Sequence, residues 1–364
     1  MNDFPIFKAG TVFNEFGGIR KKSKLVYKHI SLDFPTRLNA MTLDDLATVS
    51  GKDNHMSFPA GELLVSIDKP IRVVTKFLGN NAGCLKISNT TKRKSLVNHA
   101  YLLMCKALDV SPSLSIDVDE SNVIKHCGFG SSGAIIGAVC SSINELFGSP
   151  IKNLDLIMYI ASNYGEEIDD NNQEELKLVQ CIGGSLSTGL TKGGIQVIAG
   201  MATPIMSSEF LGKAVIGIPN DFKPKSALEL MKLEEANMNN FVSYGKNYNR
   251  EIAYKMLNKG LPSLLHGDIS VVADMAFEHR FNNGSIKNCS FIHPRVNEIA
   301  ANIRKLYEYK NCKMLAMSSV GPAFFALVGS SQQERIVTES FMAENMSTTT
   351  VDVCNTSYRV LEKE

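Results

Sequence analysis

The sequence predicts an α+β fold, because segments with strand-like alternation and segments with helical spacing follow one another without a regular βαβ order. Residues 114–118 alternate between apolar and polar side chains, whereas residues 96–108 repeat leucine and alanine at helical spacing. The chain of 364 residues is long enough for two lobes. We expect the first lobe to comprise residues 1–205 and the second to comprise residues 206–364.

Strands dominate the first third of the chain. Residues 31–41 alternate in part and are interrupted by Pro35, and two β-rich runs are separated by an Asp68-Lys69-Pro70 turn. In the rest of this lobe we expect strands at 114–118 and 195–199, and helices at 96–108, 134–147, 154–164 and 174–181.

The second lobe opens with another strand and continues with mainly helical patterning. Pro294 suits the first position of a helix, where its missing N–H costs nothing. We expect strands at 214–219, 314–317, 324–328 and 349–353, and helices at 227–237, 252–258, 269–278, 294–309 and 332–344.

Composition excludes several classes of protein. Lys and Arg number 38 against 37 Asp and Glu, so the net charge of +1 gives no footprint for nucleic acid or an acidic membrane. The longest apolar runs, at 63–67 and 323–328, fall far short of the roughly 20 residues of a membrane helix. No basic segment followed by an apolar stretch opens the chain, so we expect no secretory leader. Eight scattered cysteines without a Cys-x-x-Cys pair favour reduced thiols in a cytoplasmic protein.

Residues 126–133 carry the clearest chemical signal, reading His-Cys-Gly-Phe-Gly-Ser-Ser-Gly between an alternating strand and an apolar helix. Glycines allow positive φ and let a phosphate approach the backbone amides without a Cβ in the way. The start of the helix adds unpaired N–H groups and the positive end of its dipole. The segment therefore predicts a cradle for a phosphate or pyrophosphate.

Three other interpretations of this glycine run stay open. The spacing satisfies the G-x-G-x-x-G dinucleotide fingerprint, but that fingerprint usually follows the first strand of a βαβ unit, which the long β-rich region before it does not fit. A P-loop needs a lysine, and its nearest match at residues 184–191 has Leu190 in that place. The third interpretation is a turn that only ends a strand.

The same run is similar to the Gly-Leu-Gly-Ser-Ser phosphate loop of the GHMP superfamily, which includes galactokinase, homoserine kinase and mevalonate kinase. Residues 34–39, Phe-Pro-Thr-Arg-Leu-Asn, resemble the first motif of that superfamily, and residues 317–327 resemble the third, a Gly/Ser-rich turn before a buried strand. The resemblance implies a GHMP-type two-lobe α+β fold. Its N-terminal lobe would resemble ribosomal protein S5 and its C-terminal lobe would be ferredoxin-like.

The kinase activity of that superfamily is one hypothesis. Kinases of the galactokinase or mevalonate kinase type carry a catalytic aspartate after a Ser-Gly pair, and the corresponding residues 184–194 contain no acid. Such a carboxylate would accept the proton of a substrate hydroxyl. Homoserine kinase manages without it, so an ATP-dependent small-molecule kinase stays possible, as does an inactive binding protein.

Another branch, β-ribofuranosylaminobenzene 5′-phosphate synthase with the C-nucleoside synthases, resembles the chain in further details. A histidine precedes its phosphate loop, as His126 does here, and its Ser-Ser-Trp-Gly-Pro motif is similar to residues 318–322. Residues 188–197 resemble its Ser-Gly-Ile-Gly segment and following strand, and residues 58–70 lie where it has a glycine-rich strand ending in proline. Phe58-Pro-Ala, Val320 and Gly133-Ala depart from its pattern, which leaves the acceptor open.

This second resemblance implies a transferase that joins the anomeric carbon of phosphoribosyl pyrophosphate to a ring carbon of an aromatic carboxylate acceptor. The reaction would form a C-riboside 5′-phosphate and release CO2 and pyrophosphate. It implies Mg²⁺ as cofactor and, as in many family members, a homodimer.

Three side chains are expected to be catalytic. Arg37 would hold an anion bidentately, His126 would relay a proton or orient a phosphate, and Lys192 would supply a second cation. Each also has a plainer interpretation, namely a surface ion pair for Arg37, a hydrogen-bonded residue near a strand end for His126, and a solvated charge for Lys192.

Metal and phosphate ligands complete the expected site. Ser131 and Glu166 would bind Mg²⁺, although Glu166 also begins an acidic run typical of a solvated loop. Ser318 and Ser319 would either bind the phosphates or only cap their turn. The residues expected to bind the phosphate-bearing ligand are Gly128, Gly130, Ser131, Ser132, Gly133, Ser318, Ser319 and Gly321.

Overall fold

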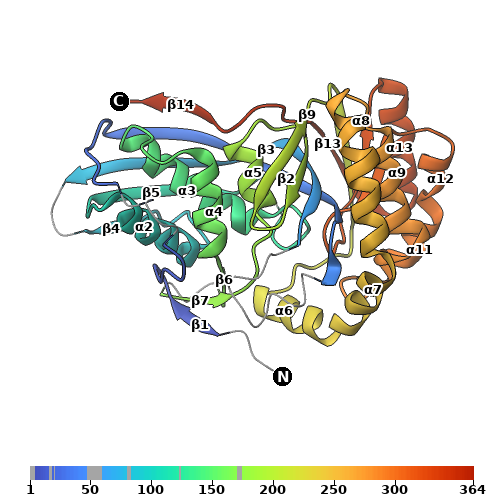
Figure 1. The fold of residues 1–364 in the computed structure, drawn as a ribbon, viewed down its shortest axis with the longest axis horizontal. Helices are drawn as coiled ribbons and strands as arrows, with labels where there is room; N and C mark the ends of the chain where they lie inside the picture. The colour runs from blue at the N-terminus through green and yellow to red at the C-terminus, as the bar shows by residue number, and fades with distance from the viewer. Residues whose placement is uncertain are drawn as a thin grey trace.

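The predicted α+β class is confirmed by the computed structural model of the chain (Figure 1). The described strands form three sheets. Residues 58 and 59, which belong to the expected glycine-rich strand region, lie outside the described residues. The structure describes residues 5–15, 19, 21–46, 60–79, 83–122, 124–169 and 174–364.

The largest described sheet has the strand order β14-β2-β3-β5-β4, with β8 paired to β3 and β9 paired to β8. Its neighbours are antiparallel except for β4 and β5. The strands are β2 His29–Thr42, β3 Glu62–Gly79, β4 Leu85–Ile87, β5 Ser113–Asp119, β8 Ile195–Ala199, β9 Thr203–Ser208 and β14 Arg359–Lys363.

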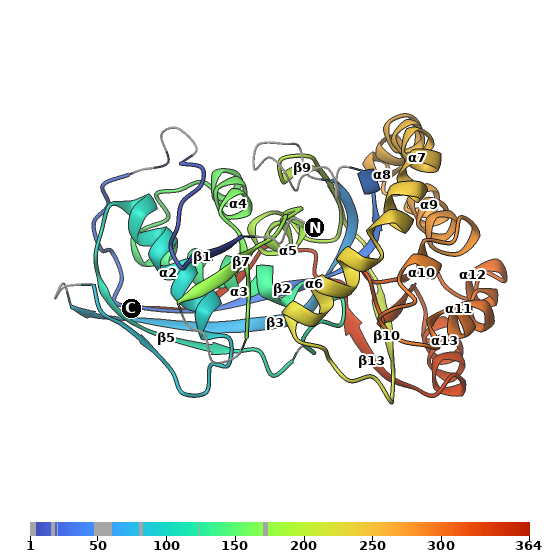
Figure 2. The same ribbon diagram turned by 90° about the horizontal axis from the view of Figure 1, so that it is seen from below.

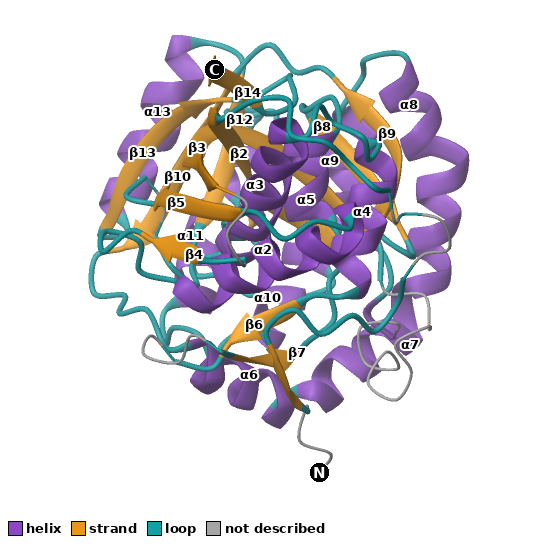
Figure 3. Ribbon diagram, turned by 90° about the vertical axis from the view of Figure 1, so that its left-hand side faces the viewer, coloured by secondary structure: helices purple, strands orange, loops and turns teal. Residues whose placement is uncertain are grey.

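Four helices pack on one face of this sheet, as Figure 3 shows. The central one, α3 (Ser131–Leu146), is buried along its whole length because nearly all its side chains are small or apolar. That burial fixes the direction of α3 and therefore the place of the glycine loop before it. The other three are α2 Lys94–Leu108, α4 Asn153–Ser162 and α5 Gly184–Leu190.

Pro35 and Pro70 do not end strands. The register between β2 and β3 shifts between Phe34 and Thr36, so residues 68–70 of β3 lie opposite Pro35 in a bulge. A bulge tolerates proline because the missing N–H falls where the ladder is already interrupted. The expected turn at 68–70 is therefore wrong, and the Thr36 hydroxyl donates a hydrogen bond to the Lys69 carbonyl across the bulge (2.9 Å).

A small sheet in the order β1-β7-β6 lies below the helices in Figure 1. Its strands are β1 Ile6–Lys8, β6 Gly165–Glu167 and β7 Glu175–Leu178. The expected helix at 174–181 is thus wrong. Strand β7 forms because it pairs with β1, a segment far away in the sequence, and local spacing carries no trace of that pairing.

The second half of the chain builds a sheet in the order β11-β12-β10-β13, with β10 Lys213–Pro219, β11 Met314–Met317, β12 Phe324–Val328 and β13 Met346–Asp352. Alternate residues face opposite sides. Ala214 and Phe325 face the large sheet, whereas Val215 and Phe324 face the outer helices.

Helices of the second half lie beyond this sheet in Figure 1, and Figure 2 shows α6 running beside the middle of the molecule. Two π-helical turns interrupt the series. Their bounds are α6 Ala227–Ala236, α7 Met238–Lys255, η1 Met256–Gly260, α8 Leu261–Leu265, α9 Ser270–Phe277, η2 Glu278–Asn282, α10 Ser285–Asn288, α11 Val296–Ile303, α12 Lys305–Glu308 and α13 Ser331–Ala343.

The division at residue 205 stays a prediction, and sheet membership does not follow it. Strand β9 crosses that position, and β14 returns from the end of the chain to pair with β2. One apolar cluster joins β2 and β3 to β10, β12 and α9, so the two halves share a core. Among the described residues, no helix combines the length and apolar character needed to cross a bilayer.

Candidate functional site

The glycine loop, the predicted phosphate cradle, connects β5 to α3. Gly128 and Gly130 have φ of +94° and +64°, and Gly130 caps α3 without a side-chain hydrogen bond. No described residue accepts a hydrogen bond from the backbone N–H groups of Gly130, Ser131, Ser132 or Gly133. These amides, at the positive end of a 16-residue helix, are available to an anion.

Close packing explains why two of these positions are glycine. A Cβ on Gly130 would overlap Ser185 Oγ and would lie 3.1 Å from Arg37 Nε. A Cβ on Gly128 would lie 2.6 Å from the Ser318 carbonyl oxygen. A side chain at either position would therefore displace a neighbour in the site, in addition to the strain of a positive φ.

Ser318 joins the three sequence motifs. Its hydroxyl donates a hydrogen bond to the Gly128 carbonyl (2.7 Å) and accepts one from the backbone N–H of Asn39 (2.9 Å). Because Ser318 is fully buried and outside the cavity lining, the prediction that it binds the ligand is corrected to a role in holding the loop. Ser319 does line the cavity, whereas Gly321, with φ of +91°, shapes the turn and is not part of the lining.

Arg93, which the sequence analysis does not single out, braces the loop from behind. It is 1% exposed, and its guanidinium donates to Ser131 Oγ (3.0 Å), to Ser132 Oγ, and to Glu167 Oε2 (2.8 Å). Burial would raise the pKa of Glu167, but its contact with His126 and the charges of Arg93 and Lys125 lower that pKa to about 2. The two loop serines are thus tied to a buried ion pair.

His126 reaches both this network and the cavity. Its φ is +51°, which directs the ring back over the loop, and its Nε2 lies 3.6 Å from Glu167 Oε1. The side chain lines the cavity and Nε2 has no hydrogen-bond partner among the described residues. The expected proton relay or phosphate-orienting role of His126 stays a prediction that this position permits.

Glu166 points into the cavity, whereas its neighbour Glu167 points into the brace. Tyr164 donates a hydrogen bond to Glu166 Oε1 (3.3 Å), and Oε2 is buried without a hydrogen bond, 3.6 Å from Arg93 Nη2. Of the two serines, Ser132 lines the cavity and Ser131 does not. A buried carboxylate oxygen beside a hydroxyl and a phosphate cradle is a donor set that fits Mg²⁺, with Ser132 better placed than the expected Ser131.

The cavity in front of the loop has a volume of about 360 Å³. Its walls come from the glycine loop, the start of α5, β2 and β3, α6 and α7, and the turn η2. The lining combines apolar and polar side chains. The apolar side chains include Leu230, Met231, Met238, Phe241 and Val320.

Arg37, Asn39 and Glu62 form a polar wall next to the loop. Arg37 Nη1 donates to the Gly128 carbonyl (3.3 Å), and its Nε lies 3.7 Å from Glu62 Oε2. Asn39 Nδ2 donates to the same carboxylate, which is 1% exposed. The first motif therefore brings the Arg37 guanidinium to the cavity, and β3 adds the buried Glu62 carboxylate; the anion-binding role of Arg37 stays a prediction.

Helix α5 presents Ser185, not an acid, to the glycine loop. Lys192, further along the same segment, does not reach the site. Its side chain is 63% exposed and pairs with Glu209 at 2.7 Å. The prediction that Lys192 supplies a catalytic cation is therefore corrected, because its side chain is exposed and lies outside the cavity lining.

Glu234 of α6 faces the cavity from the side opposite the loop. Burial and, second to it, the like charge of Glu166 raise its pKa to about 7. Two carboxylates, Glu166 and Glu234, therefore share the cavity. Among the described residues, no cluster of three or more His, Cys, Asp and Glu side chains has the geometry of a metal site.

A known family model matches the part of the chain that contains the glycine loop. Residues 95–195, which include the loop and α5, match the family model of the GHMP kinases N-terminal domain. Among curated proteins, none is a significant match to the sequence.

Solved structures share the fold at low identity. Mevalonate diphosphate decarboxylase from Staphylococcus aureus is 13% identical, with a TM-score of 0.65 over 93% of this chain and 99% of its own. Homoserine kinase from Cytophaga hutchinsonii is 14% identical, with a TM-score of 0.56 over 93% and 99%. L. major mevalonate kinase in complex with R-mevalonate is 13% identical, with a TM-score of 0.58 over 91% and 99%.

The family match covers residues 95–195, and the solved structures share the α+β fold of the chain as a whole. At these identities the solved structures establish the architecture and not the reaction.

Proposed function

We propose that the chain is a phosphotransferase that moves a phosphoryl group from ATP to a small acceptor. The observation that carries the proposal is the set of open amides at residues 130–133, of which Gly130, Ser132 and Gly133 line the same cavity as Glu166. Homoserine kinase and mevalonate kinase, whose solved structures share the fold, support this class of reaction.

Phosphoryl transfer needs positioning and electrostatic stabilisation more than covalent chemistry. The loop amides and the dipole of α3 would hold the transferred phosphate. Glu166 and Ser132 would hold Mg²⁺ together with phosphate oxygens, and the ion would neutralise charge on those oxygens. Arg93 fixes both loop serines from behind, so the cradle needs little rearrangement on binding.

Glu62 supplies a carboxylate beside the position that α5 leaves without an acid. A Cβ on Gly184, the residue before Ser185, would overlap Glu62 Oε1. The carboxylate therefore lies at the start of α5 although it comes from β3. We assign to it the task of orienting the acceptor hydroxyl and accepting its proton.

Transfer of a ribosyl group from phosphoribosyl pyrophosphate is the second candidate, and Ser185 favours it. In that reaction the cradle would hold the pyrophosphate that leaves, and no acceptor hydroxyl needs a base. The serine that faces Gly130 would then suit the site as well as an acid would. An aromatic carboxylate would be the acceptor.

Ligand-dependent stability separates the two candidates. The free energy of unfolding is measured with Mg²⁺ and ATP, and separately with Mg²⁺ and phosphoribosyl pyrophosphate. A donor present at 100 times its dissociation constant adds about 2.7 kcal/mol. Stabilisation by ATP alone supports the phosphotransferase, and stabilisation by the ribosyl donor alone replaces it with the second candidate.

A variant of the glycine loop tests where the donor binds. Gly130→Ala should abolish the stabilisation by the donor, because its Cβ collides with Ser185 and lies close to Arg37. Equal stabilisation of this variant and the wild type would show that the donor binds elsewhere and would contradict both candidates.

A further inference from the structure

Arg280 is a buried charge without an ion-pair partner among the described residues. It is 4% exposed, lies in η2 and lines the cavity. Its Nε donates to the Ala40 carbonyl (2.8 Å) and its Nη2 to Asn39 Oδ1 (3.0 Å). Within the described part of the chain, its Nη1 makes no hydrogen bond and no carboxylate lies within 4.0 Å of the guanidinium.

A second guanidinium faces the same part of the cavity. Arg37 Nε is buried without a hydrogen bond among the described residues. Asn39 connects the two, because its side chain accepts from Arg280 and donates to Glu62, which lies beside Arg37. Two cations with open donors thus converge on one polar wall.

The nearby carboxylates do not cancel both charges. Glu62 lies 3.7 Å from Arg37 Nε, beyond hydrogen-bond distance. Asp45 also lines the cavity and its carboxylate accepts from the Thr42 hydroxyl (2.5 Å). Burial raises the pKa of Asp45 above its ordinary value, although the Thr42 hydrogen bond and the charge of Arg280 act in the opposite direction. A buried charge is costly unless something pairs with it, so this wall favours an anionic ligand.

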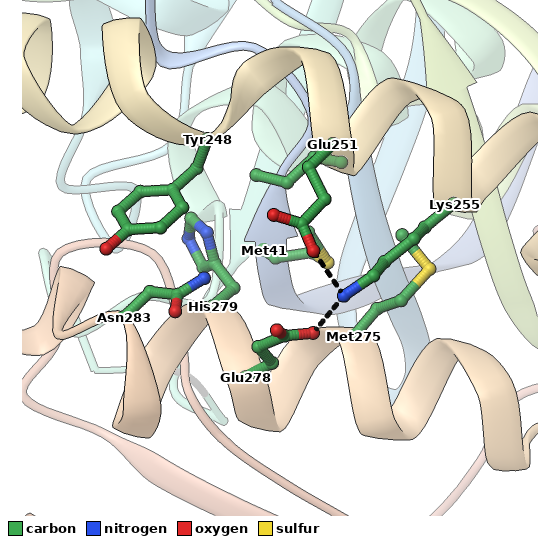
Figure 4. A pocket seen from close by; sticks show the side chains of 9 residues that line it. Met41, Tyr248, Glu251, Lys255, Met275, Glu278, His279 and Asn283 are labelled. Carbon is green, nitrogen blue, oxygen red and sulfur yellow. Dashed lines mark hydrogen bonds and ion pairs between the residues drawn. The ribbon is translucent and has the colours of Figure 1, made fainter.

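Arg280 is held rigidly. Figure 4 shows Lys255 of α7 between Glu251 and Glu278, with Nζ 2.8 Å and 2.6 Å from their carboxylates, and Glu278 is the first residue of η2. Inside the same turn, His279 Nδ1 lies 2.8 Å from the Tyr244 hydroxyl. These contacts fix η2 against α7, so the guanidinium is oriented before a ligand binds, which lowers the ordering cost of recognition.

The wall formed by α6 and α7 carries apolar side chains, including Met231 and Phe241, together with the carboxylate of Glu234. A ligand that fills the space between the two walls therefore needs an apolar body and an anionic end.

We propose that Arg280 and Arg37 form an oxyanion subsite, and that the acceptor is a small acid, a carboxylate or a phosphate ester, with an apolar body. This rests on the proposed function only in taking the cavity as the acceptor site, and it does not depend on which donor the loop binds. A planar guanidinium matches a carboxylate or phosphate bidentately, so the geometry selects this chemistry over a neutral or cationic group.

The test uses benzoate, phenyl phosphate and benzamide as probes, with dissociation constants measured by ligand-observed NMR on the full chain. Benzoate or phenyl phosphate should bind at least tenfold more tightly than benzamide, which has a similar shape without the charge. Equal binding of the anions and the amide would overturn the proposal. Preference for benzoate or for phenyl phosphate then identifies the anion as carboxylate or phosphate.

Arg280→Gln assigns the effect to the subsite. The variant should lose at least tenfold in affinity for the preferred anion, with binding of Mg²⁺ and ATP unchanged. Unchanged anion affinity would show that the probe occupies the glycine loop instead, and would overturn the proposal. If the wild type binds the anion but does not bind ATP, that result would contradict the proposed function and leave the anion subsite standing.

Arg280→Lys and Arg304→Gln complete the set. If Arg280→Gln does not fold, the lysine variant, which keeps the charge without the fork, should show an intermediate loss, and wild-type affinity in it would overturn the proposal. Arg304 is 39% exposed and pairs with Glu308, so its substitution should leave anion binding unchanged.

Discussion

The two ends of the cavity differ in how their charges are satisfied. At the loop end, Arg93 pairs with Glu167 and binds both loop serines, so its guanidinium is fully used within the protein. At the acceptor end, Arg37 Nε has no hydrogen bond, and neither has Arg280 Nη1 among the described residues. The Arg93 guanidinium is thus satisfied without a ligand, whereas the guanidinium groups of Arg37 and Arg280 keep open donors.

This difference predicts which substitutions lower folding stability and which lower ligand affinity. A satisfied buried network contributes to folding and holds the loop in place. Open donors on buried guanidinium groups contribute nothing until an acceptor arrives, and then strengthen binding. Substitutions at the loop end should therefore affect unfolding most, and substitutions at the acceptor end should affect binding and turnover.

Arg93→Leu should show the largest effect. It leaves the buried Glu167 carboxylate with only Lys125 and His126 as partners among the described residues. Breaking a buried ion pair in this way costs about 3–5 kcal/mol. The free energy of unfolding in urea measures the loss. Arg335→Leu, which removes an exposed pair with Glu339, should cost less than about 1 kcal/mol. Similar losses in both variants would contradict a special role for the brace.

The same brace makes a prediction about acid. The pKa of Glu167 is lower in the folded chain than its ordinary value of 4.5, so its contribution to stability is present above pH 4.5 and is lost as pH falls toward 2. Glu167→Gln should be less stable than the wild type at pH 7, and that difference should shrink toward pH 2. A constant difference over this range would contradict the assignment.

Glu62→Gln should mainly reduce turnover. The amide keeps the size of the side chain but cannot accept a proton, and loss of a general base lowers kcat by roughly 10²–10⁴. KM for ATP should change little, because Glu62 lies at the start of α5 and not on the loop. Steady-state kinetics with the identified acceptor give both constants. Full turnover in Glu62→Gln would remove Glu62 from the mechanism and strengthen the ribosyl-transfer candidate.

Gly130→Ala and Gly267→Ala separate crowding from backbone strain. Both glycines have positive φ, +64° and +74°, but a Cβ on Gly267 meets nothing within 4 Å. Both variants should lose about 1 kcal/mol of stability from the left-handed conformation. Calorimetry of donor binding should show a loss of affinity in Gly130→Ala and not in Gly267→Ala. Equal donor affinity in the two variants would mean that the loop does not need the close approach.

Local patterns were sufficient for most elements of this fold. Helix α3 is recognisable because glycine, serine and an apolar run follow one another in the sequence, and β8, β11 and β12 are short runs of β-rich residues. Two kinds of element were not predictable. Strand β7 depends on its pairing with distant β1, and the bulge at Pro35 depends on the register between β2 and β3.

The residues of the candidate site also fall into those that the sequence predicts and those that only the fold reveals. Gly130 and Arg37 lie in recognisable motifs and meet in space. Arg93 and Arg280 lie in no motif, and only the fold shows that each is buried against the first or second motif. Lys192 is near a motif, but its side chain is exposed and lies outside the cavity lining. Sequence reasoning could therefore find the phosphate cradle but not the charges that support it or the acceptor end.

Glu234→Gln should have the smallest effect and would sharpen the contrast between the two ends. Burial, with the like charge of Glu166, raises the pKa of Glu234 in the folded chain to about 7, above the ordinary 4.5. Ionising it therefore opposes folding: stability is retained below pH 4.5 and falls as pH rises through 7. Because the residue is partly exposed, we expect a gain on the order of 1 kcal/mol in Glu234→Gln at pH 8.

Urea unfolding of Glu234→Gln and wild type at pH 4.5 and pH 8 measures this effect. The two should be equally stable at pH 4.5 and differ at pH 8, with the variant more stable. Glu339→Gln, on the exposed face of α13, should show no such pH dependence. A variant less stable than wild type at pH 8 would mean that other groups of the protein already stabilise the ionised Glu234 carboxylate.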